Sequence, residues 1–135
     1  RILDALIDRE IDRGIPADRI VVAGFSQGGA IAVHNVLRTE RAPAGLMALS
    51  TYLPVLLTDE EEAAAKAGAA SVTVPVFAAH GTFDPMVRYQ WGRDSASLLE
   101  SLGYAVEWHE YPMLHGVCPQ EIADISDWLQ RVYSP

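Results

Sequence analysis

The sequence predicts an α/β fold in which a parallel sheet carries helices on both of its faces. Continuous apolar runs without alternating polar residues, at residues 45–50 and 74–81, are typical of parallel strands that are covered on both sides. Segments with helical periodicity lie between such runs, so that helices and strands alternate along the chain. Glycine or proline marks several of the boundaries.

The chain begins with a predicted amphipathic helix over residues 2–14, where apolar side chains recur at about 3.6-residue spacing. Gly14 is a suitable C-terminal cap, and Pro16 prevents the helix from continuing. A short β-branched run at residues 20–23 predicts the first strand. The small residues that follow predict a helix from about residue 27 to residue 38.

The rest of the chain continues the alternation. Thr58 and Glu61 have the spacing of a capping box and predict a short solvated helix between the second and third strands. The remaining expected elements are, in order, a helix over residues 88–102 that ends at Gly103, a strand over residues 105–111 and a helix over residues 119–132.

Composition narrows the class of protein. A chain of 135 residues, 50% hydrophobic and 21% charged, suits one domain over residues 1–135 with its own core. The net charge of -8 and the absence of any run among the ten Lys and Arg residues argue against nucleic acid as a partner. No apolar stretch approaches the roughly 18 residues of a membrane span. We therefore expect a soluble protein, and the single Cys118 weakly favours the cytoplasm.

The segment GFSQG, residues 24–28, predicts a turn that presents a nucleophile. Gly24 and Gly28 flank Ser26, where larger side chains are expected to collide as the chain turns sharply from strand to helix. The N–H of Gln27, at the start of the helix, is then placed to stabilise a tetrahedral oxyanion. The alternative, which is compatible with the first, is that these small residues let the helix pack closely on the sheet.

A serine nucleophile needs a base and an acid that orients the base. His115 lies in a loop between the last strand and the last helix and is the best base, while Asp84 follows the third strand and is the best acid. All three candidates fall at carboxyl ends of predicted strands, where open α/β sheets place their sites. The residues for which ordinary structural or surface roles are expected instead are His34, His80, His109, Asp94, Asp124 and Asp127.

Four segments together indicate a family: GFSQGGA from residue 24, LSTYLP from residue 49, HGTFDPMV from residue 80 and YPMLHGVCPQEIADISDWL from residue 111. They resemble the carboxylesterase and phospholipase branch of the α/β-hydrolases, close to bacterial carboxylesterases and acyl-protein thioesterases, over nearly the whole chain. The resemblance implies a three-layer α/β-hydrolase sheet. It also implies a Ser26, Asp84 and His115 triad that hydrolyses esters or thioesters of short to medium acyl chains through an acyl-enzyme. No metal or organic cofactor is expected.

A path for the acyl group is expected beside the three candidates. The residues expected to line it are Leu53, Leu56, Met86, Val87 and Leu114. For the leucines, an ordinary place in the core under a loop is an equal alternative. Cys118 is not on a turn of the kind predicted for Ser26, so it is not expected to be a nucleophile. It is expected to be a small buried residue near the site.

The family's fold has further strands before the elbow, and a loop after an early strand supplies the second oxyanion donor. No such segment precedes residue 20, so we expect the first strand to expose an edge that a second copy or a further N-terminal segment covers. Losing one oxyanion donor costs about 10² to 10³ in rate. Three hypotheses therefore stay open: a carboxylesterase for small acyl esters, a catalytically silent fragment that acts by association, and an acyl-protein thioesterase.

Overall fold

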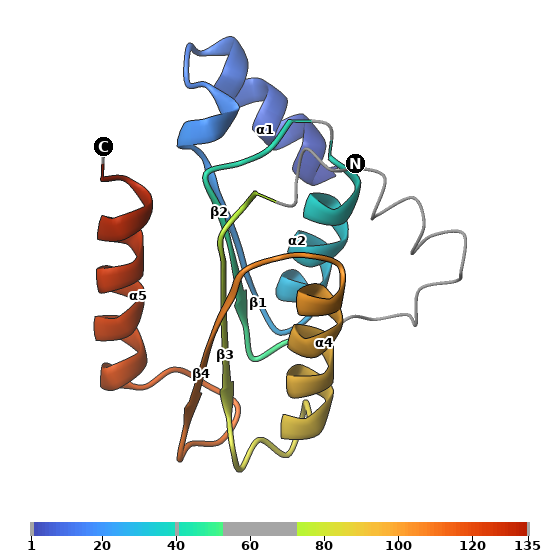
Figure 1. Cartoon of the computed structure of the whole chain (residues 1–135), viewed down its shortest axis with the longest axis vertical. Coiled ribbons are helices and arrows are strands. Elements are labelled where there is room, and N and C mark those ends of the chain that lie inside the picture. The colour runs from blue at the N-terminus through green and yellow to red at the C-terminus, as the bar shows by residue number, and fades with distance from the viewer. Residues whose placement is uncertain (1, 40, 53–72, 135) are drawn as a thin grey trace.

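The computed structural model describes residues 2–39, 41–52 and 73–134. Its centre is a parallel sheet (Figure 1) whose order across the sheet follows the order in the chain, β1 (Val21–Phe25), β2 (Gly45–Leu49), β3 (Val76–Gly81) and β4 (Val106–Tyr111). Because every pairing is parallel, the carboxyl ends of all these strands lie at one end of the sheet.

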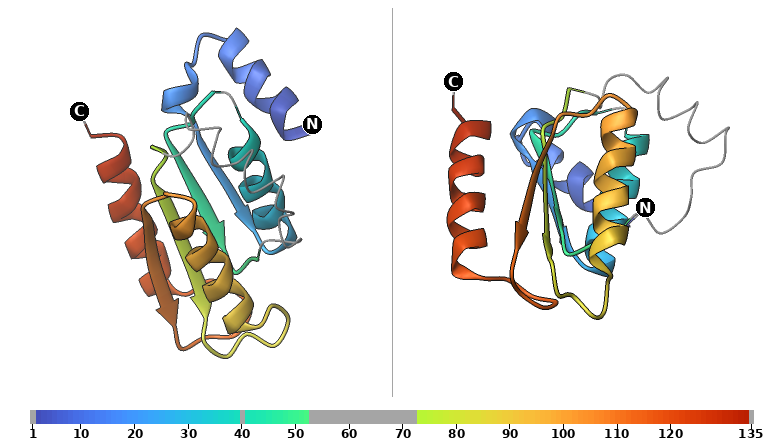
Figure 2. Two further views of the ribbon diagram at one scale, coloured as in Figure 1. Left: turned by 45° about the vertical axis from the view of Figure 1, so that its right-hand side comes forward. Right: turned by 60° about the horizontal axis from the view of Figure 1, so that its bottom comes forward.

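Helices cover both faces of the sheet (Figure 2). On one face, α2 (Gln27–Arg38) packs on β1 and β2, and α4 (Tyr89–Ser101) packs on β3 and β4. On the other face, α5 (Pro119–Val132) contacts β3. The helix α1 (Ile2–Asp12) contacts α2, and a 3₁₀ turn, η1 (Ala17–Arg19), leads into β1. The predicted three-layer fold is confirmed.

The side chains of the central strands alternate between two cores, as a pleated strand requires. Leu46 and Ala48 of β2 join the core beneath α2 and α4, whereas Met47 between them joins the core beneath α5. On β3, Phe77 is completely buried and packs against Trp128 of α5. Burial on both faces explains why these two strands are apolar in the sequence except for the buried His80 near the end of β3.

Two glycines end helices as the sequence predicts. Gly14 and Gly103 have φ of 101° and 103°, in the left-handed region that favours glycine. After α4, Gly103 N–H donates to Glu100 O and Tyr104 N–H donates to Leu99 O, which pairs the carbonyl groups that a helix end leaves free. The same pattern of bonds closes α1.

The first strand forms one edge of the described sheet. β1 pairs only with β2 among the described strands. It runs to Phe25, two residues beyond the predicted end, and both Ala23 and Phe25 are exposed. The predicted helix with the Thr58 and Glu61 capping box lies outside the described residues.

Candidate active site

A sharp turn joins β1 to α2 and carries Ser26. The backbone of Ser26 has φ 54° and ψ −122°, a conformation that is uncommon for a residue with a side chain. Its N–H donates to Leu49 O at the end of β2 (2.9 Å), and its carbonyl accepts the N–H groups of Gly29 and Ala30 in the first turn of α2. Gln27 is the first residue of α2, so its N–H is one that the helix cannot pair.

The glycine requirement of this turn differs in part from the prediction. A β-carbon on Gly24 would collide with the Gly28 carbonyl group, so Gly24 is required by close approach. At Gly28 an added β-carbon meets nothing within 4 Å, so the predicted crowding there is wrong. The crowded position is Gly29, where a β-carbon would lie 2.6 Å from Cβ of Thr51. The prediction failed because Thr51 reaches the turn from β2, far along the sequence.

The structure brings Ser26, His115 and Asp84 into one chain of hydrogen bonds. Ser26 Oγ lies 3.1 Å from His115 Nε2, and His115 Nδ1 lies 2.7 Å from Asp84 Oδ2. With Nδ1–H donating to the carboxylate, Nε2 is free to accept the serine hydroxyl proton. The imidazole is 17% exposed and the Asp84 carboxylate is fully buried.

Asp84 is held by the backbone that follows it. Oδ1 accepts the N–H groups of Met86 (2.8 Å) and Val87 (2.9 Å), which leaves Oδ2 for His115. Burial raises the pKa of Asp84, but these backbone bonds and the bond from His115 outweigh it, so that the pKa lies below its usual value. Asp84 is therefore a carboxylate at neutral pH.

The loops that carry Asp84 and His115 are bonded to each other. Phe83 N–H donates to Met113 O (3.1 Å), and Thr82 N–H donates to Tyr111 O (2.9 Å). At the end of β3, a β-carbon on Gly81 would strike the carbonyl oxygens of Met113 and Leu114. The absence of a side chain at Gly81 lets the His115 loop lie directly against β3.

The profile of the phospholipase/carboxylesterase family matches residues 1–133. The chain belongs to this family.

Curated relatives agree with that family. An acyl-protein thioesterase 1 from Cryptococcus neoformans is 41% identical over 96% of the chain and 58% of its own length. Another from Neurospora crassa is 43% identical over 92% of the chain and 50% of its own length. The chain thus spans 50 to 58% of these two relatives.

Solved structures give the same picture. The crystal structure of SOBER1 from Arabidopsis thaliana superposes with a TM-score of 0.86 at 28% identity, covering 96% of this chain and 60% of that one. The acyl-protein thioesterase 2 from Zea mays superposes with a TM-score of 0.77 at 25% identity, covering 96% of this chain and 63% of that one. The similarity therefore extends over almost all of this chain and part of each neighbour.

In this member of the phospholipase/carboxylesterase family, the expected acyl path has a mixed outcome. Met86 and Leu114 are 71% and 64% exposed, while Val87 is buried and uses its backbone to hold Asp84. Leu53 and Leu56 lie outside the described residues. A cavity of about 540 Å³ opens beside Gln27, between α1 and α2. Among the described residues, its lining includes Ile31 and Tyr52 but not Met86, Val87 or Leu114.

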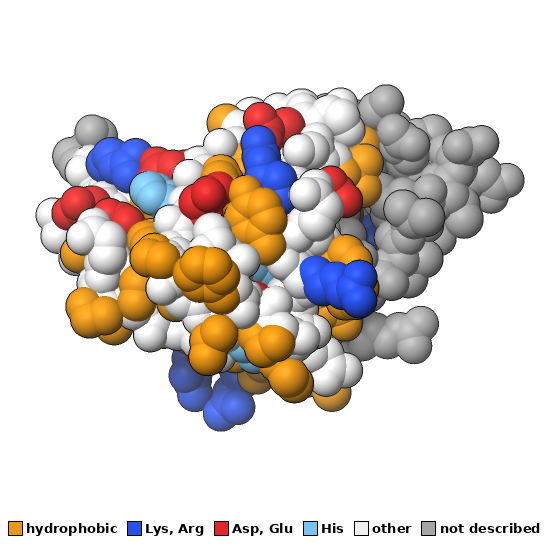
Figure 3. Space-filling view, turned by 90° about the horizontal axis from the view of Figure 1, so that it is seen from below, with side chains coloured by type: hydrophobic (Ala, Val, Ile, Leu, Met, Phe, Trp, Pro, Cys, Tyr) orange, Lys and Arg blue, Asp and Glu red, His pale blue; other side chains and the backbone are white. Residues whose placement is uncertain are grey.

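Apolar side chains gather at the carboxyl end of the sheet, the face seen in Figure 3. The exposed apolar residues at this end are Phe25, the last residue of β1, and, in the loops after β3 and β4, Phe83, Met86, Leu114 and Val117. The Phe25 ring lies 4.8 Å from the His115 imidazole, measured between centroids. Sequence reasoning missed Phe25, although its place beside Ser26 in the motif is a usable signal.

His80 has the structural role that the sequence predicts, next to the candidate acid. Its ring is buried, with Nε2–H donating to Val87 O (2.7 Å) and lying 3.5 Å from Asp84 Oδ2. Gly92 of α4 makes room for this ring, since a β-carbon there would strike His80 Nδ1. Two distant residues thus support the loop that holds Asp84.

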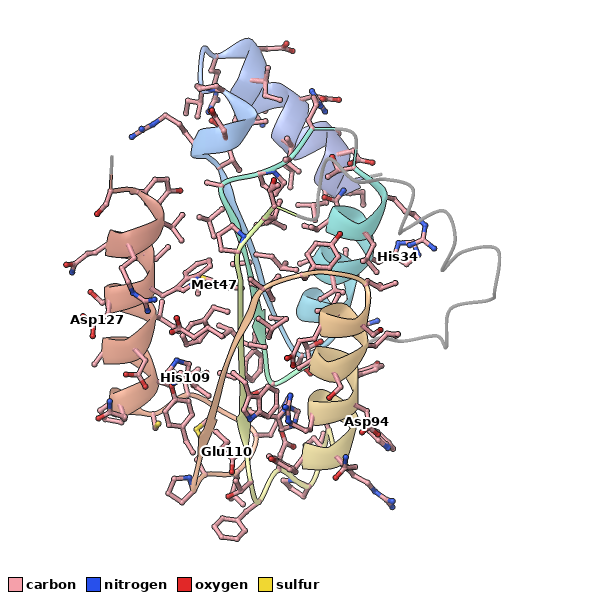
Figure 4. The ribbon with its side chains drawn as sticks, viewed as in Figure 1. His34, Met47, Asp94, His109, Glu110 and Asp127 are labelled. Carbon is pink, nitrogen blue, oxygen red and sulfur yellow. The ribbon has the colours of Figure 1, made fainter. Side chains whose placement is uncertain are left out.

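Four more histidine and aspartate residues take no part in the hydrogen bonds that join Ser26, His115 and Asp84. His34, on α2, and Asp94 and Asp127, on α4 and α5, are exposed (Figure 4). His109 lies on the α5 side of the sheet and bonds Glu107 (2.8 Å).

Two predicted surface or core roles differ in detail. Asp124 is less solvated than predicted, because Tyr111 OH donates to it (2.7 Å). Cys118 is half-buried at the start of α5.

Within residues 2–39, 41–52 and 73–134, no group of three or more His, Cys, Asp and Glu side chains is placed to hold a metal ion. In the same part of the chain, no helix is long and apolar enough to span a membrane.

Proposed function

We propose that the protein hydrolyses carboxylic esters or thioesters with short to medium acyl chains through an acyl-enzyme. The observation that carries the proposal is the hydrogen-bonded chain from Ser26 Oγ through His115 to Asp84 Oδ2. Its members come from the ends of three different strands, and the chain's family includes phospholipases and carboxylesterases. In such an arrangement, the imidazole can remove the proton from a hydroxyl that is otherwise a weak nucleophile.

In the first half of the proposed reaction, Ser26 Oγ attacks the carbonyl carbon while His115 Nε2 takes the hydroxyl proton. The resulting oxyanion lies near the N-terminus of α2, where the Gln27 N–H is proposed to stabilise it. His115 then gives the proton to the leaving group as the bond between that group and the carbonyl carbon breaks. The proton goes to oxygen when the leaving group is an alcohol and to sulfur when it is a thiol. The acyl group stays on Ser26.

In the second half, a water molecule attacks the acyl-enzyme and His115 accepts its proton. His115 then gives this proton to Ser26 Oγ as the bond from Oγ to the acyl carbon breaks, so that the acid leaves and Ser26 is regenerated. Asp84 keeps Nδ1 protonated and stabilises the imidazolium that forms twice in each cycle. The exposed apolar surface of Met86 and Leu114 is proposed to contact the acyl chain.

A second candidate function is that of an acyl-protein thioesterase. The names of the Cryptococcus neoformans and Neurospora crassa relatives favour it, at 41% and 43% identity. The chemistry at Ser26 is the same in both candidates. They differ in whether the alcohol or thiol side of the substrate is a small group or a protein.

Hydrolysis of a series of p-nitrophenyl esters and of the matching acyl thioesters tests the proposal. We expect turnover with a burst of one leaving group per chain, which reports acyl-enzyme formation, and loss of both burst and turnover in Ser26→Ala. Faster turnover of an acylated peptide than of its free thioester would favour the second candidate. No burst with any acyl length would favour a chain that is silent on its own and acts by association.

The free edge of β1 is proposed to be covered by another strand, from a second copy of the chain or from a further segment. The backbone groups along the outer side of β1 have no partner strand among the described residues, and Phe25 is exposed there. We also propose a cytoplasmic location, where the single Cys118 would stay reduced. Fractionation of cells that express a tagged chain tests the location.

A further inference from the structure

The two residues that follow β2, Ser50 and Thr51, contact both of the loops that meet at the candidate active site. Both are buried, at 0% and 6% exposure, and each uses its hydroxyl to bond a main-chain carbonyl group on a different loop. We propose that Ser50 and Thr51 are positioning residues that hold Ser26 and His115 in register. This inference rests on the proposed function, since it concerns the same nucleophile and base.

Thr51 fixes the nucleophile turn. Its Oγ1–H donates to the carbonyl oxygen of Ser26 at 2.6 Å, the shortest of the three bonds that this oxygen accepts. Its β-carbon also fills the space that a side chain on Gly29 would need. Because Leu49 O accepts the Ser26 N–H, the end of β2 binds both main-chain polar groups of the nucleophile. These bonds help to keep Ser26 in its uncommon conformation.

Ser50 reaches the other loop. Its Oγ lies 3.4 Å from the carbonyl oxygen of Gly116, the residue after His115, and its N–H donates to Ala79 O of β3 at 2.8 Å. Ser50 has φ of 48°, a left-handed conformation that is uncommon for a residue other than glycine. A serine in this position keeps a hydroxyl that glycine would lack, at the cost of backbone strain.

The bond between Ser26 and His115 joins residues 89 positions apart, so it depends on how their two loops are held. Asp84 holds the imidazole of His115, whereas Ser50 and Thr51 connect the two loops, with only a single peptide bond between their two contacts. A misplacement of about 1 Å between reacting groups can cost about 10²-fold in rate. A purely structural role would instead lower stability and leave the reactivity of Ser26 unchanged.

The test measures the rate constant for labelling of Ser26 by a fluorophosphonate in the whole chain, together with the thermal midpoint of each variant. Thr51→Val removes the hydroxyl and keeps the shape, whereas Thr51→Ser keeps the hydroxyl. Ser50→Gly removes the hydroxyl and relieves the left-handed backbone. The matched controls, Thr39→Val and Ser101→Ala, each remove an exposed hydroxyl that contacts a main-chain carbonyl away from the site.

We expect Thr51→Val to label about 10- to 100-fold more slowly than the controls, and Thr51→Ser to recover most of the loss. Ser50→Gly is expected to label more slowly while its thermal midpoint stays level or rises, because glycine adopts positive φ without strain. Replacing a residue with a merely structural role would not slow the labelling while the thermal midpoint stayed level or rose. Labelling of Thr51→Val and Ser50→Gly at the rate of the controls would overturn the inference.

Amide hydrogen exchange keeps the inference testable if the unmodified chain is not labelled, an outcome that would count against the proposed function alone. Faster exchange over residues 24–30 in Thr51→Val and over residues 114–118 in Ser50→Gly, relative to the controls, would support the positioning role. Unchanged exchange in both segments would refute it.

Discussion

Asp84 uses its two carboxyl oxygens for different partners. Oδ1 accepts hydrogen bonds from the backbone of its own loop, and Oδ2 accepts one from His115. The backbone bonds therefore fix the position of the carboxylate independently of His115. Four groups surround this one side chain: the N–H groups of Met86 and Val87 and the ring of His80, which are near Asp84 in the sequence, and the ring of the distant His115.

The first prediction concerns Asp84→Asn. The amide oxygen can keep the two backbone bonds at Oδ1, so the fold is expected to survive. The amide NH₂ then faces His115 Nδ1 and favours the wrong tautomer, which in the chymotrypsin triad costs about 10⁴ in kcat. We expect a loss of about 10³- to 10⁴-fold in kcat/KM, measured by ester hydrolysis with circular dichroism as a check on folding. Activity at the level of the unmodified chain would point to a different acid.

The glycines of the elbow give a second prediction, in which neighbouring positions behave oppositely. Gly28→Ala has open space and lies in the first turn of α2, so it is expected to be neutral or to stabilise the fold by up to about 1 kcal/mol. Gly29→Ala must displace Thr51 and is expected to lower the free energy of unfolding by about 1 to 3 kcal/mol. Urea unfolding measures both. Equal effects at the two positions would contradict the packing described for this turn.

At the scale of elements, α5 is tied to the edge strand β4 by polar contacts above an apolar core. Arg131 of α5 donates two hydrogen bonds to Glu107 of β4, at 2.7 and 3.0 Å, and Tyr111 OH of β4 donates to Asp124 of α5. The bonds from Arg131, helped by His109, lower the pKa of Glu107 to about 2 against the opposing effect of burial. This helix begins just after the His115 loop, so its docking helps to place that loop.

The third prediction is the pH dependence of this tie. The pKa of Glu107 falls from 4.5 to about 2 on folding, so its carboxylate stabilises the fold above pH 4.5 and the stabilisation is lost as the pH falls toward 2. The pair is partly exposed, so Glu107→Gln is expected to cost about 0.5 to 1 kcal/mol near neutral pH. The free-energy difference from the unmodified chain should shrink steadily in urea unfolding series at lower pH. A difference that grows on acidification would rule out the ion pair as its source.

At the scale of the whole molecule, β1, the strand that leads into Ser26, is an edge of the sheet formed by the described residues. The fourth prediction is that a strand of a second copy covers this edge. A variant at Val22 would not test it, because Val22 is buried beneath α2 and its replacement would disturb the core. Ala23→Pro removes a main-chain N–H from the exposed strand. The comparison is Ala44→Pro, directly before β2, which removes an N–H that already donates to Ile20 O within the fold. Light scattering should find a second copy bound to the unmodified chain, and a lower association constant for Ala23→Pro than for the comparison. A strictly monomeric chain would leave a further segment as the proposed cover.

Local patterns predict the order of elements and the places of Ser26, Asp84 and His115. Apolar runs, helix caps and the loops after strands can each be recognised from a few consecutive residues. The supporting contacts depend on how the elements pack. Thr51 crowds Gly29 because parallel strands bring their carboxyl ends together, and His80 requires Gly92 because α4 packs on β3. Val87 was expected in an acyl path, but its loop turns back to bond Asp84 and carries the side chain inside. Such outcomes need the register of the sheet, which a single sequence does not specify.

The reactivity of Ser26 is the central claim, and intact mass after incubation with a fluorophosphonate tests it most directly. We expect one adduct per chain, absent in Ser26→Ala and strongly slowed in His115→Ala, because the label requires a serine whose proton is removed by the neighbouring imidazole. An unmodified chain that stays unlabelled while folded, or a Ser26→Ala variant that labels equally well, would contradict the account.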